Sequence, residues 1–521
     1  MSINVFLASM KMAMATFLSR ILGLVREQVI AFYFGASGFT DAFLVAYRIP
    51  NLLRDLFAEG AFSAAFVPSF VEANLKNKEE ARKLLWSLFI FLGLVTFSFS
   101  LLIFIFAPEI ITVFAPSFVE SSEKFELTVL LTRVMSPFLF LVSLAALFMG
   151  VLNSLKIFFI PSLAPAFFNL TTIASVLFFV NRFSELGLNP ILSVAVGVTL
   201  GGLVQAMVQL PLIFKRGYGP IRLTKIFTRE SKKVIVKLGP GLLGFAATQI
   251  NLIVNTILAS GTVVGAVSWL SFAFRLFQLP VGILSVSIGN SNLVLFSKAW
   301  KAGDKKQAVE LLQGSYFLSL YLVLPAMIAL ILCSDEMINV IFERGKFTAD
   351  STVMTAKALR WYALGLPFYS LYKIFVPTFY SIDRQKIPVY CSIVGIILNI
   401  IFSVALVPSY GFEILAVGTT LSILLNACAQ AWILKSDLNF ELNFYLNIRL
   451  VKILLSGITT FFLVYFVKTQ IHFLEFNFLI RCGFLFGYLV VIALCYFGFC
   501  AALGERELFK QILAKFIRKN S

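Results

Sequence analysis

Residues 77–106, NKEEARKLLWSLFIFLGLVTFSFSLLIFIF, join a charged segment to a long segment that has no charged side chain. The uncharged part, 84–106, is long enough to cross about 30 Å of hydrocarbon as an α-helix. It lacks the strict alternation of polar and apolar residues that is typical of a half-buried strand. We therefore predict a membrane-spanning helix that follows a charged, water-exposed turn.

Segments of this kind recur along the whole chain of 521 residues. A mean hydropathy of +0.92 and a charged fraction of 13% leave too little polar surface to cover a soluble globule. Because the recurring segments have the length of helices, we predict an all-α integral membrane protein with about fourteen transmembrane helices. The predicted spans are centred near residues 20, 55, 95, 140, 170, 203, 247, 280, 323, 368, 397, 423, 458 and 490.

The distribution of basic residues predicts the orientation in the membrane. With the N-terminus in the cytoplasm, the inner loops and the C-terminal tail hold about 24 Lys and Arg residues, and the outer loops about 5. Because the number of spans is even, both termini are predicted to be cytoplasmic. The net charge of +17 is then mainly a topology signal, with contacts to anionic membrane lipids as a consequence. Nucleic-acid binding is not expected.

The charged segment also marks an internal repeat. A shift of 227 positions aligns 77–85 with DKKQAVELL at 304–312, and PEIITVFA at 108–115 with DEMINVIF at 335–342. Six spans per repeat give both halves the same orientation, so we expect two lobes around a central cavity, as in transporters. A channel or a scaffold could be built from the same duplication. The predicted parts are an N-terminal lobe at 1–220, a C-terminal lobe at 221–440, two additional helices at 441–505 and a basic cytoplasmic tail at 506–521.

The first two predicted spans carry charged side chains that the second repeat mostly lacks. A charge at mid-depth in the bilayer costs at least about 2.5 to 3.5 kcal/mol on insertion scales, so such groups face a water-filled cavity or a partner. Charges that only held helices together would be expected in both halves, and the asymmetry therefore favours a binding site. The aligned pairs are Arg20 with Ala247, Arg26 with Ile253, Asp41 with Ser268, Arg48 with Arg275, Arg54 with Val281 and Glu59 with Val286.

An excess of arginine predicts an anionic ligand, because the guanidinium fork matches phosphate or carboxylate. Arg26, Arg54 and Arg275 lie well inside their apolar segments, whereas Arg48 and Asp41 could neutralise each other in a purely structural role. The two additional helices would supply apolar surface for a long hydrocarbon chain. These features together indicate a lipid with an anionic headgroup. No metal site and no enzymatic activity are expected, since the sequence shows no metal-ligand spacing, nucleophile motif or phosphate-binding glycine loop.

Three motifs resemble the MurJ/MviN family of bacterial lipid II flippases, in the multidrug, oligosaccharidyl-lipid and polysaccharide exporter superfamily. They are SRILGLVREQVIAFYFG at 19–35, TDAFLVAYRIPNLLRDLFAEGAFSAAFVP at 40–68 and SWLSFAFRLFQLPVGILSVSIG at 268–289. The resemblance implies fourteen helices, a central cationic cavity and a groove for a polyprenyl tail between the two additional helices. It also implies transport of the undecaprenyl-diphosphate-linked peptidoglycan precursor, lipid II, from the inner to the outer leaflet of the bacterial cytoplasmic (inner) membrane by alternating access.

By motif, the resemblance implies that four arginines bind the diphosphate and that three further charged residues support them or gate the cavity. The arginines are Arg20, Arg26, Arg54 and Arg275, and the supporting residues are Asp41, Arg48 and Glu59. Two departures from the family pattern are Asp55, where many relatives have a second basic residue, and Phe274, where many have an acidic one.

The driving force and the partners are also implied by the resemblance. Some relatives are proposed to hold a sodium ion in the C-terminal lobe. The corresponding spans here offer a weak cation site without a carboxylate, made of Asn255, Asn399, Ser403 and Thr420. The membrane potential is therefore the simpler driving force, and no other cofactor is expected. Cell-wall synthesis enzymes are the expected protein partners.

Three alternatives stay open at this point. A flippase for another polyprenyl-diphosphate oligosaccharide would present the same diphosphate to the same arginines. A cation or drug antiporter of the same superfamily would need acidic residues at mid-depth, and these are sparse. A non-transporting scaffold in cell-wall assembly would tolerate replacement of the buried arginines.

Overall fold

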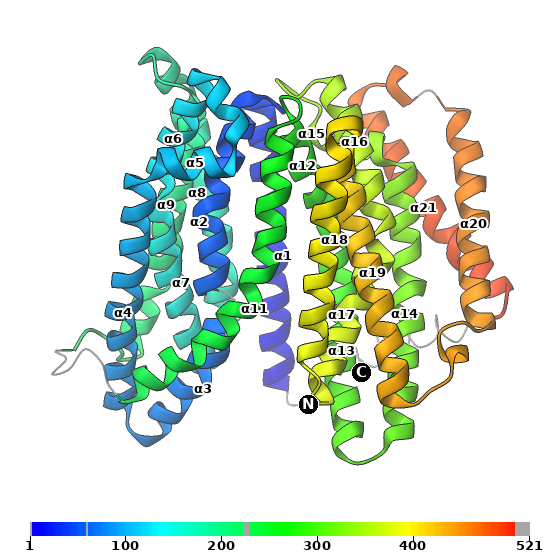
Figure 1. Cartoon of the computed structure of the whole chain (residues 1–521), viewed down its shortest axis with the longest axis horizontal. Coiled ribbons are helices and arrows are strands. Elements are labelled where there is room, and N and C mark those ends of the chain that lie inside the picture. Colours follow the sequence, from blue (N-terminus) through cyan, green and yellow to red (C-terminus); the bar gives the residue numbers. More distant parts are fainter. Residues whose placement is uncertain (1–2, 59–60, 222–228, 472, 506–521) are drawn as a thin grey trace. The chain divides into compact units, whose positions relative to one another are not determined.

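The computed structural model describes residues 3–58, 61–221, 229–471 and 473–505, and every regular element in these ranges is a helix (Figure 1). The chain divides into two compact units. The first comprises Met1–Ser268 together with Arg344–Phe347, and the second comprises Trp269–Glu343 and Thr348–Ser521.

In the first unit, α1 packs along α8, and α8 packs along α9. Helix α7 lies between α4 and α9, and large aromatic side chains such as Phe138 and Phe148 fill the space around it. The helices are α1 Ile3–Phe34, α2 Gly38–Ala58, α3 Ala61–Lys76, α4 Lys78–Ile105, α5 Ala107–Phe114, η1 Pro116–Glu120, α6 Ser122–Met135, α7 Pro137–Ser154, α8 Phe159–Glu185, α9 Leu192–Met207, α10 Leu210–Lys215 and α11 Arg229–Ser260.

In the second unit, α13, α14 and α17 pack against one another, and α18 packs along α19. The helices are α12 Ala266–Pro280, which begins in the first unit, η2 Val281–Ser285, α13 Val286–Lys301, α14 Lys305–Leu332, α15 Ser334–Phe342, α16 Ala349–Leu364, α17 Leu366–Ser381, α18 Lys386–Tyr410, α19 Glu413–Leu438, η3 Leu442–Phe444, α20 Ile448–Thr469, η4 Phe473–Glu475 and α21 Phe478–Ala502.

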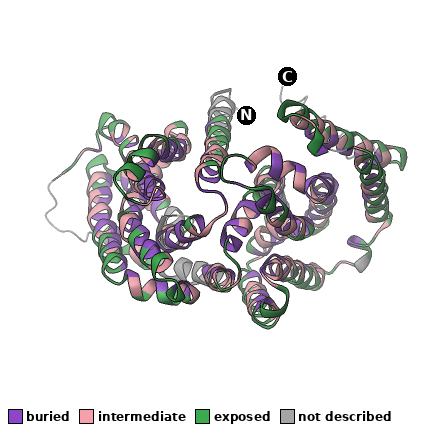
Figure 2. Cartoon of the chain, turned by 90° about the horizontal axis from the view of Figure 1, so that it is seen from above, coloured by how far each residue is buried: buried purple, intermediate pink, exposed green. Residues whose placement is uncertain are grey.

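The two additional helices, α20 and α21, pack on α14 and keep much of their apolar surface exposed, as Figure 2 shows at its right-hand side. The end of α20 and the start of α21 are held by polar contacts to the α15 region. Lys468 Nζ lies 2.9 Å from Glu336 Oε1, and Arg481 Nη1 donates a hydrogen bond of 3.4 Å to Asn339 Oδ1. Exposed apolar helices of this length are typical of lipid contact.

The membrane architecture is confirmed. All fourteen predicted centres fall within helices, and ten helical segments of the described residues are long and apolar enough to cross a membrane. The centres near 20, 55, 247 and 368 fall in α1, α2, α11 and α17, which are not among the ten. Helices α1 and α2 carry the predicted charge cluster, and α11 contributes only a shorter apolar stretch, Gln249–Ser260. The count of fourteen therefore stays a prediction.

The helix boundaries confirm the repeat. Adding 227 to the bounds of α4, 78 and 105, gives 305 and 332, the bounds of α14. The same shift carries the starts of α6 and α8, at 122 and 159, onto the starts of α16 and α18, at 349 and 386. The equivalent residues Asn77 and Asp304 both cap their helices, each accepting a hydrogen bond of 2.9 Å from a backbone N–H of the first turn.

The second repeat contains an irregular turn where the first repeat has a regular helix. Helix α2 continues through Pro50 to Ala58, so residues 54–58 are α-helical. The shift of 227 places residues 54–58 on Val281–Ser285, a π-helical turn directly after Pro280. Proline lacks the N–H that a regular helix needs at this point, which favours the wider turn.

The boundary between the compact units lies later in the chain than the predicted lobe boundary at 220. Helix α11, the predicted first helix of the second lobe, packs on α2 and α3 in the first unit. The lobe boundary follows the repeat and stays a prediction.

Candidate functional site

Arg26 is the central residue of the candidate site. It lies on α1 with 8% of its surface exposed, and α8 holds its guanidinium from the opposite side. Its Nη1 donates a hydrogen bond of 3.1 Å to Asn169 Oδ1, and its Nη2 donates one of 2.5 Å to Glu27 Oε1. The guanidinium carbon also lies 5.5 Å from the centroid of the Phe168 ring. These contacts fix the orientation of the guanidinium plane.

One other predicted arginine, Arg54, lies within electrostatic range of Arg26. Arg54 of α2 is half-buried, and its charge interacts with that of Arg26. Arg20 lies six positions before Arg26 on α1 and is exposed. Two guanidinium groups that share one environment repel each other, and an anion between them would remove that repulsion. The arrangement thus favours binding of an anion in the first unit.

The other predicted arginines and Glu59 are distributed differently. Arg48 is half-buried on α2, and Arg275 is exposed on α12 in the second unit. Glu59 lies outside the described residues.

Asp41 holds the N-terminus of α12. Its carboxylate is 1% exposed and accepts hydrogen bonds from the backbone N–H groups of Gly265, at 2.7 Å, and Ser268, at 3.0 Å. The Ser268 hydroxyl donates a third hydrogen bond of 2.7 Å, and Lys124 Nζ lies 3.7 Å away. A carboxylate at a helix N-terminus is stabilised by the unpaired N–H groups and by the helix dipole. Asp41 and Ser268 are equivalent positions of the repeat, so this contact joins the two repeats within the first unit.

Two further contacts at this end of the first unit are also related by the repeat. Ser117 of η1 donates a hydrogen bond of 2.7 Å to the carbonyl of Ser260, at the end of α11. In the equivalent place, the Lys346 N–H donates one of 2.9 Å to the carbonyl of Phe32, near the end of α1. Gly35, with a φ of +64°, allows this approach, because a Cβ there would lie 2.3 Å from the Lys346 carbonyl oxygen. Each repeat therefore contacts the first helix of the other.

The residues of the predicted weak cation site are divided between the two units, so this site stays a prediction. Asn399 and Ser403 are buried on α18, with Ser403 Oγ 3.4 Å from Asn399 Oδ1. Thr420 donates its hydroxyl to the Trp361 carbonyl at 2.7 Å, and Asn255 belongs to the first unit. Among the described residues, no group of three or more His, Cys, Asp and Glu side chains could hold a metal ion.

Sequence reasoning missed two residues. Asn169 orients Arg26 and also donates a hydrogen bond of 3.1 Å to the Ser19 carbonyl, but nothing in its local sequence links it to α1. Lys373 lies within the α17 segment FYSLYKIFVPTFY, half-buried between aromatic rings. Its Nζ is 5.4 Å from the centroid of Tyr369 and 5.9 Å from that of Tyr372. The position of Lys373, a charged residue within an apolar segment, was the sequence feature that could have identified it.

The fold of this chain is shared with a solved protein of low sequence identity. That protein, a multidrug-resistance MATE family transporter of the MOP superfamily in an inward-facing conformation, superposes with a TM-score of 0.67 at 14% identity, covering 81% of this chain and 94% of that one. At this identity the likeness concerns the fold alone.

The chain belongs to the lipid II flippase MurJ family, whose model matches residues 30–482. It is 35% identical to a probable lipid II flippase MurJ of Buchnera aphidicola subsp. Schizaphis graminum over 89% of this chain and 91% of that one. It is 32% identical to the lipid II flippase MurJ of Burkholderia cenocepacia over 98% and 100% of the two chains. A solved lipid II flippase MurJ in an inward closed conformation superposes with a TM-score of 0.80 at 28% identity, covering 96% of this chain and 99% of that one.

Proposed function

We propose that this chain is a lipid II flippase that carries the lipid-linked peptidoglycan precursor from the inner to the outer leaflet of the bacterial cytoplasmic membrane. Family membership and the names of the relatives support this proposal. The observation that carries it is the buried Arg26 with Arg54 in its electrostatic environment. A flippase is a transporter and not an enzyme, which agrees with a site that consists of binding groups.

The diphosphate of the substrate would be held by the arginines. A guanidinium has five N–H donors, and Arg26 uses one on Asn169 and one on Glu27. Its Nε is buried without a hydrogen-bond partner among the described residues. The free donors can turn to a phosphate oxygen, while Asn169 and Glu27 keep the group in place. Arg20, Arg54 and Arg275 would add charge, and the surface of α20 and α21 would accommodate the polyprenyl chain.

Alternating access would use the contacts between the repeats as the outer closure. Three contacts join segments of the two repeats at one end of the first unit. They are the hydrogen bonds of the Asp41 carboxylate to the start of α12, of Ser117 to the Ser260 carbonyl, and of the Lys346 N–H to the Phe32 carbonyl. Opening this end requires all three contacts to separate. Substrate binding would then supply the free energy that favours the open state, because a ligand shifts an equilibrium only by its differential affinity.

Orientation and driving force follow as parts of this proposal. Lysines gather at the turn between α13 and α14, the end opposite to the outer closure in the predicted topology, which supports a cytoplasmic location for both termini. The membrane potential would act on the positive charge of the site, since moving one charge through 100 mV is worth about 2.3 kcal/mol. Cell-wall synthesis enzymes stay the predicted protein partners.

The direct test is the exposure of lipid II in the outer leaflet of cells that are depleted of their own flippase and supplied with this chain. We expect wild-type protein to restore exposure, and purified protein in vesicles to flip lipid II. If the folded protein flips another polyprenyl-diphosphate oligosaccharide and not lipid II, the substrate assignment is wrong. If neither lipid moves, the scaffold alternative replaces transport.

Replacing Asn169 with alanine tests the orientation of Arg26. The variant loses the hydrogen bonds from Arg26 and to Ser19, so we expect flipping to fall by about tenfold, the effect of one charge-assisted hydrogen bond. The matched control is Asn181→Ala on the same helix, where the asparagine is exposed, and it should flip like wild type. Equal rates for both variants in vesicles would contradict an orienting role for Asn169.

A further inference from the structure

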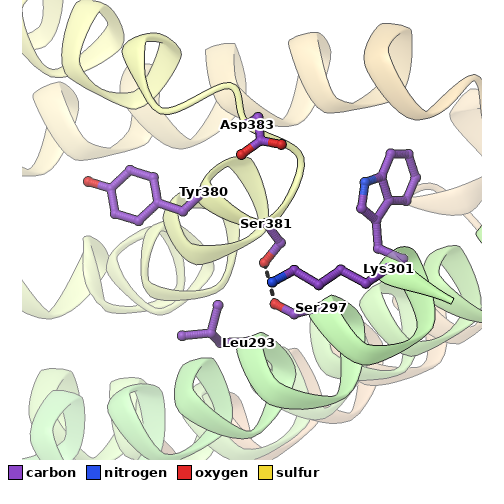
Figure 3. Close-up of a pocket in the computed structure, with 7 residues that line it drawn as sticks. Leu293, Ser297, Lys301, Tyr380, Ser381 and Asp383 are labelled. Atoms are coloured by element: carbon purple, nitrogen blue, oxygen red, sulfur yellow. Dashed lines mark hydrogen bonds between the residues drawn. The ribbon is translucent and has the colours of Figure 1, made fainter.

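A cavity of about 430 Å³ opens between the ends of α13 and α17 in the second unit (Figure 3). This volume is within the range of small-ligand sites. Its lining includes none of the arginines discussed above. Its lining is mostly polar and consists of Leu293, Ser297, Trp300, Lys301, Tyr380, Ser381 and Asp383.

The repeat explains why the cavity exists in the second unit. The shift of 227 places Leu293 on Phe66 and Ser297 on Phe70. In the first unit these two phenylalanines are fully buried, with ring centroids 5.4 Å apart, and they fill the equivalent space. The smaller side chains of the second repeat leave that space open. Because close packing is the default in protein interiors, a cavity kept open by small polar residues points to an occupant.

The charge of the lining indicates an anion. Lys301 and Asp383 both line the cavity, yet neither forms an ion pair within the described part of the chain. Further cations surround the opening, since Lys305 lies 5.7 Å from the Trp300 ring centroid and Lys298 is exposed one turn before Lys301. The local excess of positive charge favours a ligand with a phosphate group.

The hydroxyl groups and the carboxylate indicate what accompanies the phosphate. Figure 3 shows Lys301 extending toward Ser297 and Ser381, whose Oγ atoms lie 2.6 Å apart. Ser381 donates its hydroxyl to the Pro377 carbonyl at 2.9 Å, so Ser297 donates to Ser381 and keeps a lone pair that can accept a hydrogen bond from a ligand hydroxyl. Asp383 can only accept, so it suits the hydroxyl groups of a polyol. A phosphodiester of glycerol satisfies the ammonium, the hydroxyls and the carboxylate together.

The position in the fold indicates a lipid as the source of this phosphate. Trp300 and Tyr380 are residue types that gather at the membrane–water interface, and Val294 and Leu295 leave α13 apolar and exposed beside the cavity. Basic pockets between transmembrane helices on the cytoplasmic side are typical sites for acidic lipid headgroups. We infer that the cavity between α13 and α17 binds the headgroup of an anionic glycerophospholipid of the phosphatidylglycerol class.

The test is native mass spectrometry of the purified full-length protein, titrated with phosphatidylglycerol, phosphatidylethanolamine and phosphatidylcholine. We expect one phosphatidylglycerol to bind more tightly than the other two lipids. Ser297→Phe, which introduces the residue of the first repeat, should abolish this binding. Lys301→Gln should weaken it by about fivefold, the effect of one lysine near an anionic lipid. The matched control Lys298→Gln, which changes an exposed lysine outside the lining, should bind like wild type.

Thermal unfolding of each variant shows whether it is folded. If Ser297→Phe does not fold, the lipid affinity of Lys301→Gln tests the inference. Equal losses for Lys301→Gln and Lys298→Gln would overturn the inference, because a general surface charge would then explain binding. Equal affinity for phosphatidylethanolamine would overturn the anionic assignment. Displacement of the lipid by inorganic phosphate would assign the cavity to free phosphate, and displacement by undecaprenyl diphosphate would assign it to the transported substrate.

Discussion

Replacing Arg26 with alanine should lower lipid II flipping by at least about 100-fold, because the substrate diphosphate loses the donors of a fixed, buried guanidinium. The same change removes the 2.5 Å contact between Arg26 and the buried carboxylate of Glu27, so a loss of stability is also expected. The measurement is the initial rate of flipping in vesicles at matched protein content.

Two variants separate binding from stability. Arg26→Lys keeps the charge beside Glu27 but loses the planar fork, so we expect a fall of about tenfold with little change in the thermal unfolding midpoint. Arg133→Ala removes another arginine of the first unit, whose Nε donates a hydrogen bond of 3.2 Å to the Phe104 carbonyl, and it should flip like wild type. If folded Arg26→Ala protein flips lipid II at the wild-type rate, the diphosphate does not bind at Arg26.

The repeat and the helix boundaries were predictable because local chemistry determines them. A charged turn with a capping residue starts α4 at Lys78 and, 227 positions later, α14 at Lys305. The length of the apolar segment that follows fixes the other end of each helix. Both signals lie in adjacent residues, so one sequence is sufficient to find them.

Features that depend on distant contacts were not predictable in the same way. The packing of α11 in the first unit arises from contacts with α2 and α3, which lie far from it in the sequence. Asn169 lies 143 positions from Arg26, and no local pattern connects the two residues. The sequence therefore predicts a set of candidate arginines but gives no indication of the residue that holds Arg26.

The cavity between α13 and α17 illustrates the same limit. Leu293 and Ser297 are ordinary residues for a transmembrane helix, and their sequence context gives no sign of a cavity. They become informative only when the structure shows that Phe66 and Phe70 fill the equivalent space of the first repeat. Comparing the two repeats in the structure thus shows that the smaller side chains leave a cavity open, which the aligned sequences alone do not indicate.

Replacing Asp41 with alanine should weaken the closure at the outer end by about 2 to 5 kcal/mol, since three hydrogen bonds to a buried carboxylate are lost. The closed state would then lose about 30- to 4000-fold in population relative to the open state, since each step of about 1.4 kcal/mol is a factor of ten. We expect flipping to fall by about tenfold, because a transporter that stays open on one side completes fewer cycles. The flipping rate in vesicles measures this effect.

The change in closure itself can be followed at Val267, which is buried beside Ser268 in the first turn of α12. A Val267→Cys reporter should react slowly with a membrane-impermeant thiol reagent in the parent and at least about tenfold faster with Asp41→Ala, because residues near a weakened contact open more often. Asp350→Asn changes an exposed acidic residue in the first turn of α16 and should leave the reporter unchanged. If Asp41→Ala slows flipping without raising the reactivity of the reporter, Asp41 supports the substrate site instead, and the outer closure depends on the Ser117 and Lys346 contacts.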